Sequence, residues 1–279
     1  RSRRTRLTGQ GRGRVTGDTG HLMRDIHISI VSHGQARYLD GLFAQLAAMP
    51  SVARAQVTLT LNVTEVLPAA VDAMPFPVRV LRNARPQGFA HNHNVAFREP
   101  PVPAEQQYFV VLNPDVELRG DLFAGLADRL RDAPEVGVIA PQVLAADGAR
   151  EDSARYLPTP SRLVAKLFGR RGAWPVEVDD RPFQPDWVAG MCMLFPRQAF
   201  AEVDGFDTRY HLYYEDVDIC SRLWLSGYTV MVDPRFSIIH AAQRSSHRNL
   251  RYARWHLQSM LRFFRSNVYR KARALHGRR

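Results

Sequence analysis

Cysteine and long hydrophobic runs are scarce in this chain. Its only cysteines, Cys192 and Cys220, are too few for a disulfide framework and lack metal-ligand spacing, which favours a reducing compartment. The longest apolar run, Val188 to Phe195, is about eight residues, against the roughly 20 of a membrane-spanning helix. No apolar segment follows the basic N-terminus as in a signal peptide. We therefore expect a cytoplasmic protein, soluble or peripheral at the inner face of the cell membrane.

Acidic residues are missing from one end of the chain. Residues 244–279 hold eleven Lys and Arg and no acid, and residues 1–20 hold six Arg and one Asp. Residues 21–243 carry 21 basic and 26 acidic residues, so the net charge of +11 belongs to the two ends. A wholly basic surface would indicate nucleic acid, whereas two basic ends favour disorder or attraction to an anionic membrane surface. Charge alone leaves one alternative open, a non-catalytic protein that binds RNA or another anionic surface.

Apolar periodicity is absent from residues 1–22, which are rich in Arg, Gly and Thr. We predict a disordered N-terminal segment there, with Met23 as a candidate natural start. The remainder divides into a folded domain over residues 23–248 and a basic helical extension over residues 249–279.

Short apolar strands alternate with helical spacing through the first half of the chain. The predicted strands are 26–32, 57–63, 78–81, 108–112 and 136–140, and the predicted helices are 38–49, 92–98 and 122–131. This alternation predicts an α/β fold with a Rossmann-like, mostly parallel sheet and helices on both faces. Ligands of such sheets bind beyond the carboxyl ends of the strands.

The second half is less regular. Residues 146–186 lose periodicity and predict an extended connection. After the apolar stretch 187–195 we expect helices at 196–203 and 216–226, a strand at 229–232 and another that ends near His240.

Asp115 ends the predicted strand at 108–112, in the sequence Asn113-Pro114-Asp115. A carboxylate there is a natural ligand for Mg²⁺ or Mn²⁺, which usually keep waters and bind substrate phosphates as well. Asn, Pro and Asp also form turns, and such turns are far commoner than metal sites, so the tripeptide alone favours an ordinary turn or helix cap.

Three acids open the predicted helix at 216–226: Glu215, Asp216 and Asp218. Negative charge stabilises a helix N-terminus, and Asp218 is spaced to pair with Arg222. Stabilisation of the helix N-terminus accounts less well for two adjacent acids, Glu215 and Asp216, directly after the aromatic pair at 213–214. A carboxyl beside apolar rings can have a raised pKa suited to general-base work.

Two further segments end strands with polar residues. Gly88 permits close backbone approach before a helix whose N-terminus attracts phosphate, and His91 and His93 are more typical of a solvated loop than of a metal site. His240 is followed by Arg244 and two serines, which suit a diphosphate, although a buried structural histidine is an equal reading.

The ordered set of these motifs resembles the bacterial family 2 glycosyltransferases, and within them the rhamnosyltransferase-like enzymes of cell-surface polysaccharide biosynthesis. The resemblance covers about residues 25–270. It rests on Ser32-His33, Asn83, Gly88-Phe89-Ala90 with Asn94, Leu112-Asn113-Pro114-Asp115, Gly190-Met191-Cys192, Gly205-Phe206-Asp207, Glu215-Asp216-Val217-Asp218 and His240.

The resemblance implies a GT-A fold, a nucleoside-diphosphate-sugar donor and a divalent cation, Mg²⁺ or Mn²⁺. It makes Asp115 and His240 the metal-binding pair, and Asp216 the catalytic base with Glu215 beside it. The residues expected to bind the donor are Ser32, Asn62, Asn83, Gly88, Phe89, Asn94, Asn113 and Arg244.

Three departures from the family's usual motifs concern the donor. Ser32-His33-Gly34 replaces the usual Thr-Tyr-Asn, and Leu61 stands where an acid is usual, which leaves the nucleotide open. Asn92 and Ala96 replace usual glycines and narrow the room near the donor. We expect dTDP-rhamnose first and a UDP-sugar second, with inversion by a single displacement on a glycan or lipid-linked acceptor and no nucleic-acid partner.

The C-terminal segment intersperses aromatics and leucines with arginines from Asn249 onward. Such a helix suits a membrane interface. We expect Met260, Leu261 and Phe264 to dock on the catalytic body, and the basic tail beyond Phe264 to meet anionic lipid.

Overall fold

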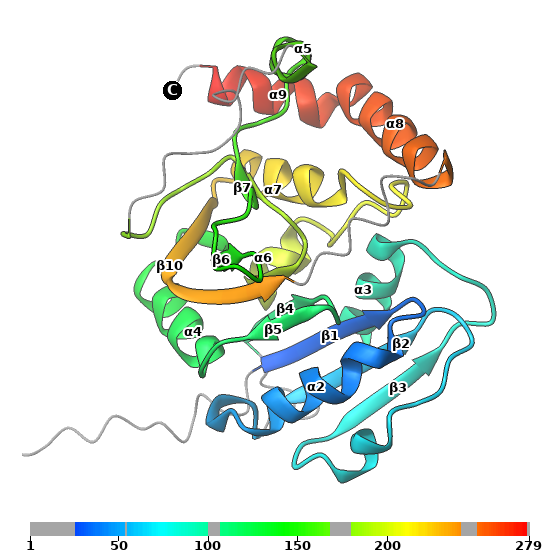
Figure 1. Ribbon diagram of the computed structural model, residues 1–279. Coiled ribbons are helices and arrows are strands. Elements are labelled where there is room, and N and C mark those ends of the chain that lie inside the picture. Colours follow the sequence, from blue (N-terminus) through cyan, green and yellow to red (C-terminus); the bar gives the residue numbers. More distant parts are fainter. Residues whose placement is uncertain (1–25, 54, 100–106, 168–179, 241–249, 278–279) are drawn as a thin grey trace, which may run out of the picture.

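The computed structural model describes residues 26–53, 55–99, 107–167, 180–240 and 250–277 (Figure 1). The N-terminal segment that was predicted to be disordered lies outside these residues. The described chain is an α/β structure built around one large sheet, which confirms the predicted fold class.

The sheet has eight strands in the order β3-β2-β1-β4-β9-β6-β10-β5. The parallel strands are β1 (Ile26–Ser32), β2 (Gln56–Leu61), β3 (Val78–Arg82), β4 (Tyr108–Leu112), β6 (Val136–Leu144) and β10 (Thr229–His240). Two strands run antiparallel to them, β9 (Cys192–Pro196) between β4 and β6, and β5 (Val116–Leu118) beside β10. The sheet is thus mostly parallel, as predicted, while β5 was not predicted, because three residues are too short to show a periodic pattern.

Helices cover both faces of the sheet. On one face lie α2 (Ala36–Ala47) and α4 (Leu122–Asp132), together with the short 3₁₀ turns Pro50–Val52 and Ala69–Ala73. On the other lie α3 (Phe89–Arg98), α6 (Arg197–Glu202) and α7 (Glu215–Leu225). The side chains of β4 alternate between the two resulting cores, as a strand buried on both faces requires.

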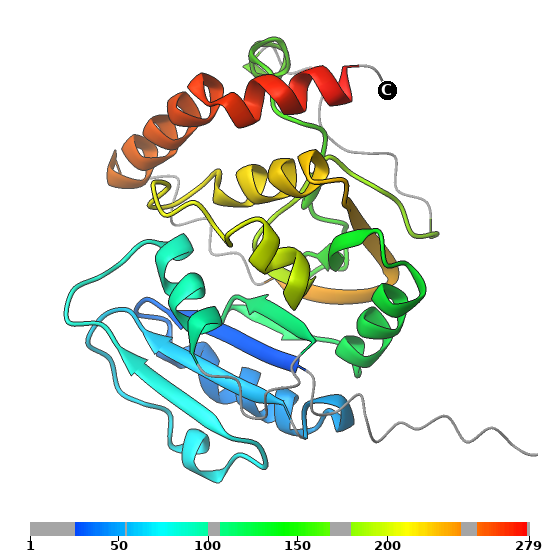
Figure 2. The same ribbon diagram turned by 180° about the vertical axis from the view of Figure 1, so that it is seen from behind.

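Two C-terminal helices form a further layer outside α7, as the view from behind shows (Figure 2). They are α8 (Leu250–Arg265) and α9 (Asn267–His276), so the helical extension predicted over residues 249–279 consists of two helices. The break lies at Ser266, whose hydroxyl oxygen accepts a hydrogen bond from the Tyr269 N–H at 3.0 Å and caps α9.

The prediction that docking ends near Phe264 is wrong. Tyr269 and Ala272 of α9 are buried in the same core as Phe263, and the His276 imidazole lies 2.9 Å from the Asp186 carboxylate. Leu261, which was expected to dock, is 41% exposed. The basic segment therefore packs on the body along most of its length.

The stretch 146–186 contains more structure than its composition predicts. Strands β7 (Ala154–Arg155) and β8 (Trp187–Val188) form a small second sheet, and α5 (Pro160–Leu167) follows β7. Among the helices of the described residues, none is long and apolar enough to cross a membrane.

Candidate active site

A pocket of about 360 Å³ opens at the carboxyl ends of β1, β2 and β4, where the parallel sheet was expected to bind its ligand. Four of the predicted donor-site and metal-site residues line it together: Asn62, Phe89, Asn113 and Asp115. The fold thus brings residues from separated segments of the sequence to one place. Their roles toward a ligand stay predictions.

A network of side-chain amides forms one wall of the pocket. The Asn62 carbonyl oxygen accepts hydrogen bonds from the Asn83 amide at 2.8 Å and from the Gln87 backbone N–H at 2.8 Å. The Asn83 amide also donates to the Asn92 carbonyl oxygen at 2.7 Å. Asn83 thus reaches the pocket through its neighbours and fixes Asn62 and Asn92, which line it.

Ser32 and Asn94 do not line this pocket. The fully buried Ser32 hydroxyl donates to the Glu65 carboxylate at 2.8 Å, and Glu65 also accepts from the Ala36 N–H at the start of α2. The Asn94 amide donates to the Phe206 carbonyl and its oxygen accepts from the Phe206 N–H, at 2.7 and 2.9 Å. Both residues, predicted to bind the donor, are engaged in holding loops.

Gly88 makes the close approach that its lack of a side chain predicts, but the partner is the protein itself. A Cβ at Gly88 would lie 2.6 Å from the His211 carbonyl oxygen, and the Phe89 N–H donates to that oxygen at 3.0 Å. The start of this helix was expected to bind phosphate. At Phe89 that expectation is wrong, because the backbone N–H already donates to His211. Arg244 lies outside the described residues.

The two histidines of the same helix, His91 and His93, have different surroundings. His93 is buried and its Nδ1 lies 2.8 Å from the Ser29 hydroxyl, while His91 is exposed. Burial lowers the pKa of His93 to about 3, so the ring is neutral. The interpretation of this segment as a solvated loop is therefore wrong for His93, which is a buried side chain of α3.

Asp115 and His240 come together because β5 pairs with the end of β10. In that antiparallel ladder His240 lies opposite Val116, the residue after Asp115. The His240 Nε2 atom is 3.7 Å from the Asp115 Oδ2 atom. The nearby carboxylate of Asp115 raises the pKa of His240, and that of Glu151 adds to the effect.

Glu151 was not predicted. Its carboxylate lies 3.2 Å from His240 Nδ1, which a tight turn at 145–149 makes possible by leading the chain back from the end of β6. The turn contains Asp147-Gly148, with Gly148 at φ +83°. An Asp-Gly pair after a strand is a turn signal that would have predicted this return of the chain.

The residues around Asp115 fit a divalent cation. The Asp115 Oδ1 atom is buried and has no hydrogen-bond partner among the described residues. In that part of the chain, no three of His, Cys, Asp and Glu cluster closely enough to hold a metal alone. Mg²⁺ and Mn²⁺ sites that share a substrate diphosphate need only one or two protein carboxylates, so an open site of this kind is suitable.

The two remaining predicted residues, Glu215 and Asp216, begin α7. The preceding residues Tyr213 and Tyr214 have φ values of +70° and +69°, a left-handed conformation that is uncommon for aromatic residues. Backbone strain of this kind persists only where the surroundings enforce it and clusters at functional sites. Here it directs the start of α7 and its acids toward a second pocket.

That second pocket, of about 320 Å³, is lined by both acids and by aromatic rings, among them Trp187 and Tyr213. Glu215 is buried and Asp216 is half-buried. Removal from water raises the pKa of both carboxyls, which is the direction a general base needs. Arg155 also lines the pocket and acts on Asp216 in the opposite sense.

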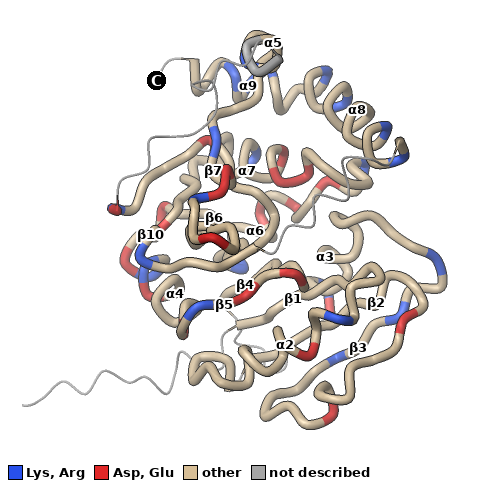
Figure 3. Tube along the Cα trace, viewed as in Figure 1, with Lys and Arg blue, Asp and Glu red and all other residues tan. Residues whose placement is uncertain are grey.

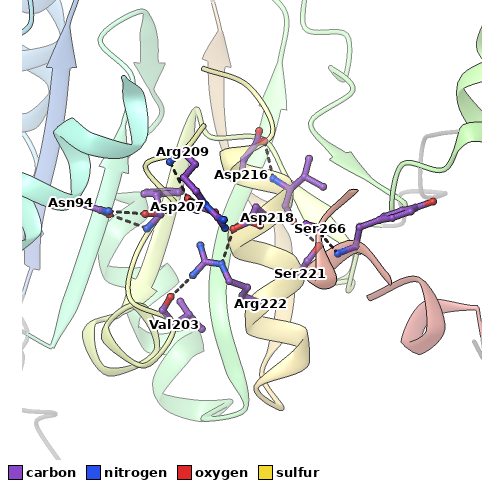
Figure 4. Close-up of polar contacts among 12 residues, drawn as sticks. Asn94, Val203, Asp207, Arg209, Asp216, Asp218, Ser221, Arg222 and Ser266 are labelled. Carbon is purple, nitrogen blue, oxygen red and sulfur yellow. Dashed lines mark hydrogen bonds and ion pairs between the residues drawn. The ribbon is translucent and has the colours of Figure 1, made fainter. Parts of the chain in front are cut away.

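Asp218 has a structural role. Its carboxylate accepts from the Arg222 Nε–H at 2.7 Å, and Arg222 also binds the Val203 carbonyl oxygen (Figure 4). The pairing at i, i+4 confirms the sequence interpretation of Asp218. In Figure 4 the Asp216 side chain points away from this cluster.

Helix α8 supplies a wall to both pockets. Tyr252 and Trp255 line the pocket that contains Asp115, and His256 lines the pocket that contains Asp216. Tyr252 and Trp255 were among the aromatics predicted to suit a membrane interface, and the structure instead turns them toward the body. The missed signal was the i, i+3, i+4 spacing of Tyr252, Trp255 and His256, which places these three side chains on one face of the helix.

Comparison with known proteins decides the family. A rhamnosyltransferase of Escherichia coli K12, WbbL, is 32% identical to this chain over 188 residues, covering 63% of this chain and 69% of WbbL. The chain belongs to the family 2 glycosyltransferases. An N-acetylglucosaminyl-diphospho-decaprenol L-rhamnosyltransferase of Mycobacterium tuberculosis is 31% identical over 156 residues, covering 53% of this chain. The match spans only about half (51%) of that relative's length. No family model matches the chain.

Solved structures show that this family 2 glycosyltransferase has the GT-A fold. The mannosyltransferase PcManGT from Pyrobaculum calidifontis, in complex with GDP-Man and Mn²⁺, superimposes with a TM-score of 0.59 at 15% identity, covering 89% of this chain and 69% of that one. GalNAc-T7 with UDP, GalNAc and Mn²⁺ gives 0.58 at 15% identity, covering 79% of this chain and 44% of that one. At these identities the likeness establishes the architecture alone.

Proposed function

We propose that this protein is an inverting glycosyltransferase that moves a sugar from a nucleoside diphosphate to a hydroxyl of a lipid-linked glycan. The observation that carries the proposal is the arrangement of two pockets on one loop. Residues 211 and 212 line the pocket with Asp115, and residues 213–216 line the pocket with Asp216. A cation-binding carboxylate and a basic carboxylate thus flank a single strained segment.

The donor binds in the pocket at the carboxyl ends of β1, β2 and β4. The exposed Gln87 side chain offers an amide to the nucleoside, with Asn62 and Asn92 holding the wall behind it, and Trp255 and Tyr252 offer rings for stacking. Asp115 and His240 would hold the divalent cation, Mg²⁺ or Mn²⁺, and the Glu151 carboxylate orients the imidazole through its other nitrogen. The bound cation would neutralise charge on the departing nucleoside diphosphate.

The acceptor binds in the pocket around Asp216. Its sugar lies against Trp187 and Tyr213, and its hydroxyl gives its proton to the Asp216 carboxylate while the oxygen bonds to the anomeric carbon of the donor sugar. The bond from that carbon to the diphosphate oxygen breaks on the opposite face. One displacement therefore inverts the anomeric configuration.

The names of two relatives support a choice of substrates. Both are rhamnosyltransferases by name, and one is named for a diphospho-decaprenol acceptor that carries N-acetylglucosamine. We propose dTDP-rhamnose as the donor, with a UDP-sugar second, and a polyprenyl-diphosphate-linked sugar as the acceptor. Such an acceptor would place the enzyme peripherally at a membrane.

Thermal shift with nucleotide sugars, with and without Mn²⁺, tests the donor site, because a ligand that binds only the folded state raises the melting temperature. We expect dTDP-rhamnose to stabilise the wild type in Mn²⁺, the stabilisation to vanish in EDTA, and Asp115→Asn to abolish it. The exposed Asp132→Asn on α4 is the matched control and retains the shift.

Equal stabilisation with and without cation would contradict the proposed metal site. A non-catalytic protein that binds RNA through its basic ends would show no donor shift, and its binding would fall steeply with salt.

A further inference from the structure

A third cavity, of about 640 Å³, lies between helix α8 and the loop 209–211. Three of its lining residues are arginines, Arg209, Arg262 and Arg265, and none is acidic. It meets the donor pocket at His211 and Trp255, which line both. The mechanism uses none of the three arginines.

The charge of this cavity is only partly neutralised. Arg209 is paired with Asp207 at 2.5 Å. Within the described residues, no carboxylate is paired with Arg262 or Arg265, which follow one another along α8 and are both exposed. Figure 3 shows the same asymmetry over a wider area, since α8 and α9 carry blue positions and no red ones. Such a cavity would attract a phosphate group.

The outer face of α8 carries exposed apolar side chains next to these arginines. Leu250 is 89% exposed, Leu257 51% and Leu261 41%, and Leu261 also lines the cavity. Their spacing of seven and four residues places all three on one stripe, opposite the buried Ser259 and Phe263. Exposed leucines bordered by arginines are the pattern of a helix that lies in a membrane interface.

We propose that the outer face of α8 is a docking surface for an anionic phospholipid bilayer and that the cavity at Arg262 and Arg265 takes a lipid phosphate headgroup. This extends the proposed function, since it rests on a lipid-linked acceptor. The basic segment beyond Phe264, predicted to meet the membrane, packs on the body through Tyr269 and Ala272, and the proposed membrane contact is instead the exposed stripe of α8. Because the inner face of α8 lines the donor and Asp216 pockets, docking there brings both to the membrane surface.

Cosedimentation of the full chain with vesicles at low salt tests the surface. We expect binding to vesicles of phosphatidylglycerol and phosphatidylcholine and little binding to phosphatidylcholine alone. Arg262→Gln with Arg265→Gln weakens binding about 30-fold, because each basic residue at an anionic surface is worth about fivefold in affinity. The control Arg82→Gln with Arg119→Gln removes the same charge from exposed positions outside the cavity and changes binding less than about threefold.

A second pair of variants tests the apolar stripe. Leu257→Gln with Leu261→Gln weakens vesicle binding, whereas Val66→Gln, at a site that is 83% exposed, leaves it unchanged. Melting curves verify that each variant is folded. The leucine variant keeps every arginine, so it tests the apolar contribution to binding separately from the charge. The proposal is overturned if the wild type does not bind anionic vesicles, or if either the double arginine variant or the double leucine variant binds them as the wild type does, as would happen if another basic segment carried the binding. Donor binding measured without vesicles is independent of this outcome, so failure here leaves the proposed transfer reaction to be judged by its own test.

Discussion

The carboxyl groups of Glu215 and Asp216 are adjacent in the chain but have different surroundings. Glu215 is 5% exposed, and its Oε2 atom has no partner among the described residues. Asp216 is more open, and its Oδ1 atom accepts the Val217 N–H at 2.8 Å. Substrate can reach Asp216 more readily, which favours Asp216 as the base and Glu215 as a buried neighbour that holds its proton.

Glu215 should make stability depend on pH. Burial raises its pKa in the folded state, and the charge of Asp216 adds to this. The folded protein therefore keeps a proton that the unfolded chain releases above about pH 4.3. The stability that this group contributes is full below that pH and is lost as pH rises toward the raised pKa, by up to ~1.4 kcal/mol per pH unit.

Glu215→Gln removes this dependence. We predict that the variant gains melting temperature relative to the wild type as pH rises from 5 to 8, and that the two are most alike at the acidic end. Melting curves at several pH values measure the difference. A constant difference across this range would show that the buried carboxyl does not hold its proton.

Asn94 offers a second test at this scale, because the structure gives it a structural contact where the sequence predicts donor binding. Asn94→Ala leaves the N–H and C=O of Phe206 without their partners, which costs about 1–3 kcal/mol for each buried group. We predict a lower urea midpoint with an unchanged donor dissociation constant once the protein is folded. A large loss of donor affinity at full stability would restore the original assignment.

At the scale of elements, α9 is an integral part of the body. Tyr269 and Ala272 are buried, and Phe263 of α8 lies beneath them in the same core. Ending the chain after Ser266 uncovers Phe263 and removes Tyr269, each worth about 1.5–3 kcal/mol when fully buried. We predict a loss of at least ~3 kcal/mol in the free energy of unfolding.

Urea unfolding of the two truncated chains measures this loss. A chain that ends at Gly277, and so lacks only the last two arginines, is the control and should match the full protein. If the chain ending at Ser266 were as stable as the control, α9 would be a peripheral tail, as the sequence first suggested.

The elements that periodicity predicted are those with one strong pattern. Strands β1 and β4 are found with the predicted bounds, since continuous apolar runs flanked by polar residues leave little choice. β7, β8 and α5 were not predicted, because a two-residue strand has no period and α5 lies in a stretch rich in Pro and Arg. The break at Ser266 was missed because apolar spacing continues across it, from Phe264 to Val268.

The site residues that could be predicted from the sequence are those that lie at or just after the ends of strands. Asp115 and His240 follow β4 and end β10, and the pairing of β5 with β10 brings them together. Glu151 and Arg155 were missed because the turn signal at Asp147-Gly148 was not used, and without that turn the chain after β6 does not lead back to the site. Asn94 and Ser32 matched the family motif, yet only the fold shows that their hydrogen bonds go to Phe206 and Glu65.

For the whole molecule, charge and shape now fit one arrangement. One pocket opens at the carboxyl ends of β1, β2 and β4, a second lies at the start of α7, and α8 contributes side chains to both. Helices α8 and α9 carry basic and no acidic positions (Figure 3). The division expected between a catalytic domain over 23–248 and an extension over 249–279 is a boundary in sequence more than in structure, because α8 and α9 share the core of α7.

The central claim, that Asp216 is the base and Asp115 belongs to the donor site, is tested most directly by Asp216→Asn. Donor affinity and the rate of sugar transfer from dTDP-rhamnose to a polyprenyl-diphosphate-linked N-acetylglucosamine are measured on the same protein. Asp204→Asn, an exposed acid on the loop before α7, serves as control and should retain both. The account predicts that Asp216→Asn binds donor within about threefold of the wild type and transfers sugar about 10²–10⁴-fold more slowly. Turnover near the wild-type rate would contradict it.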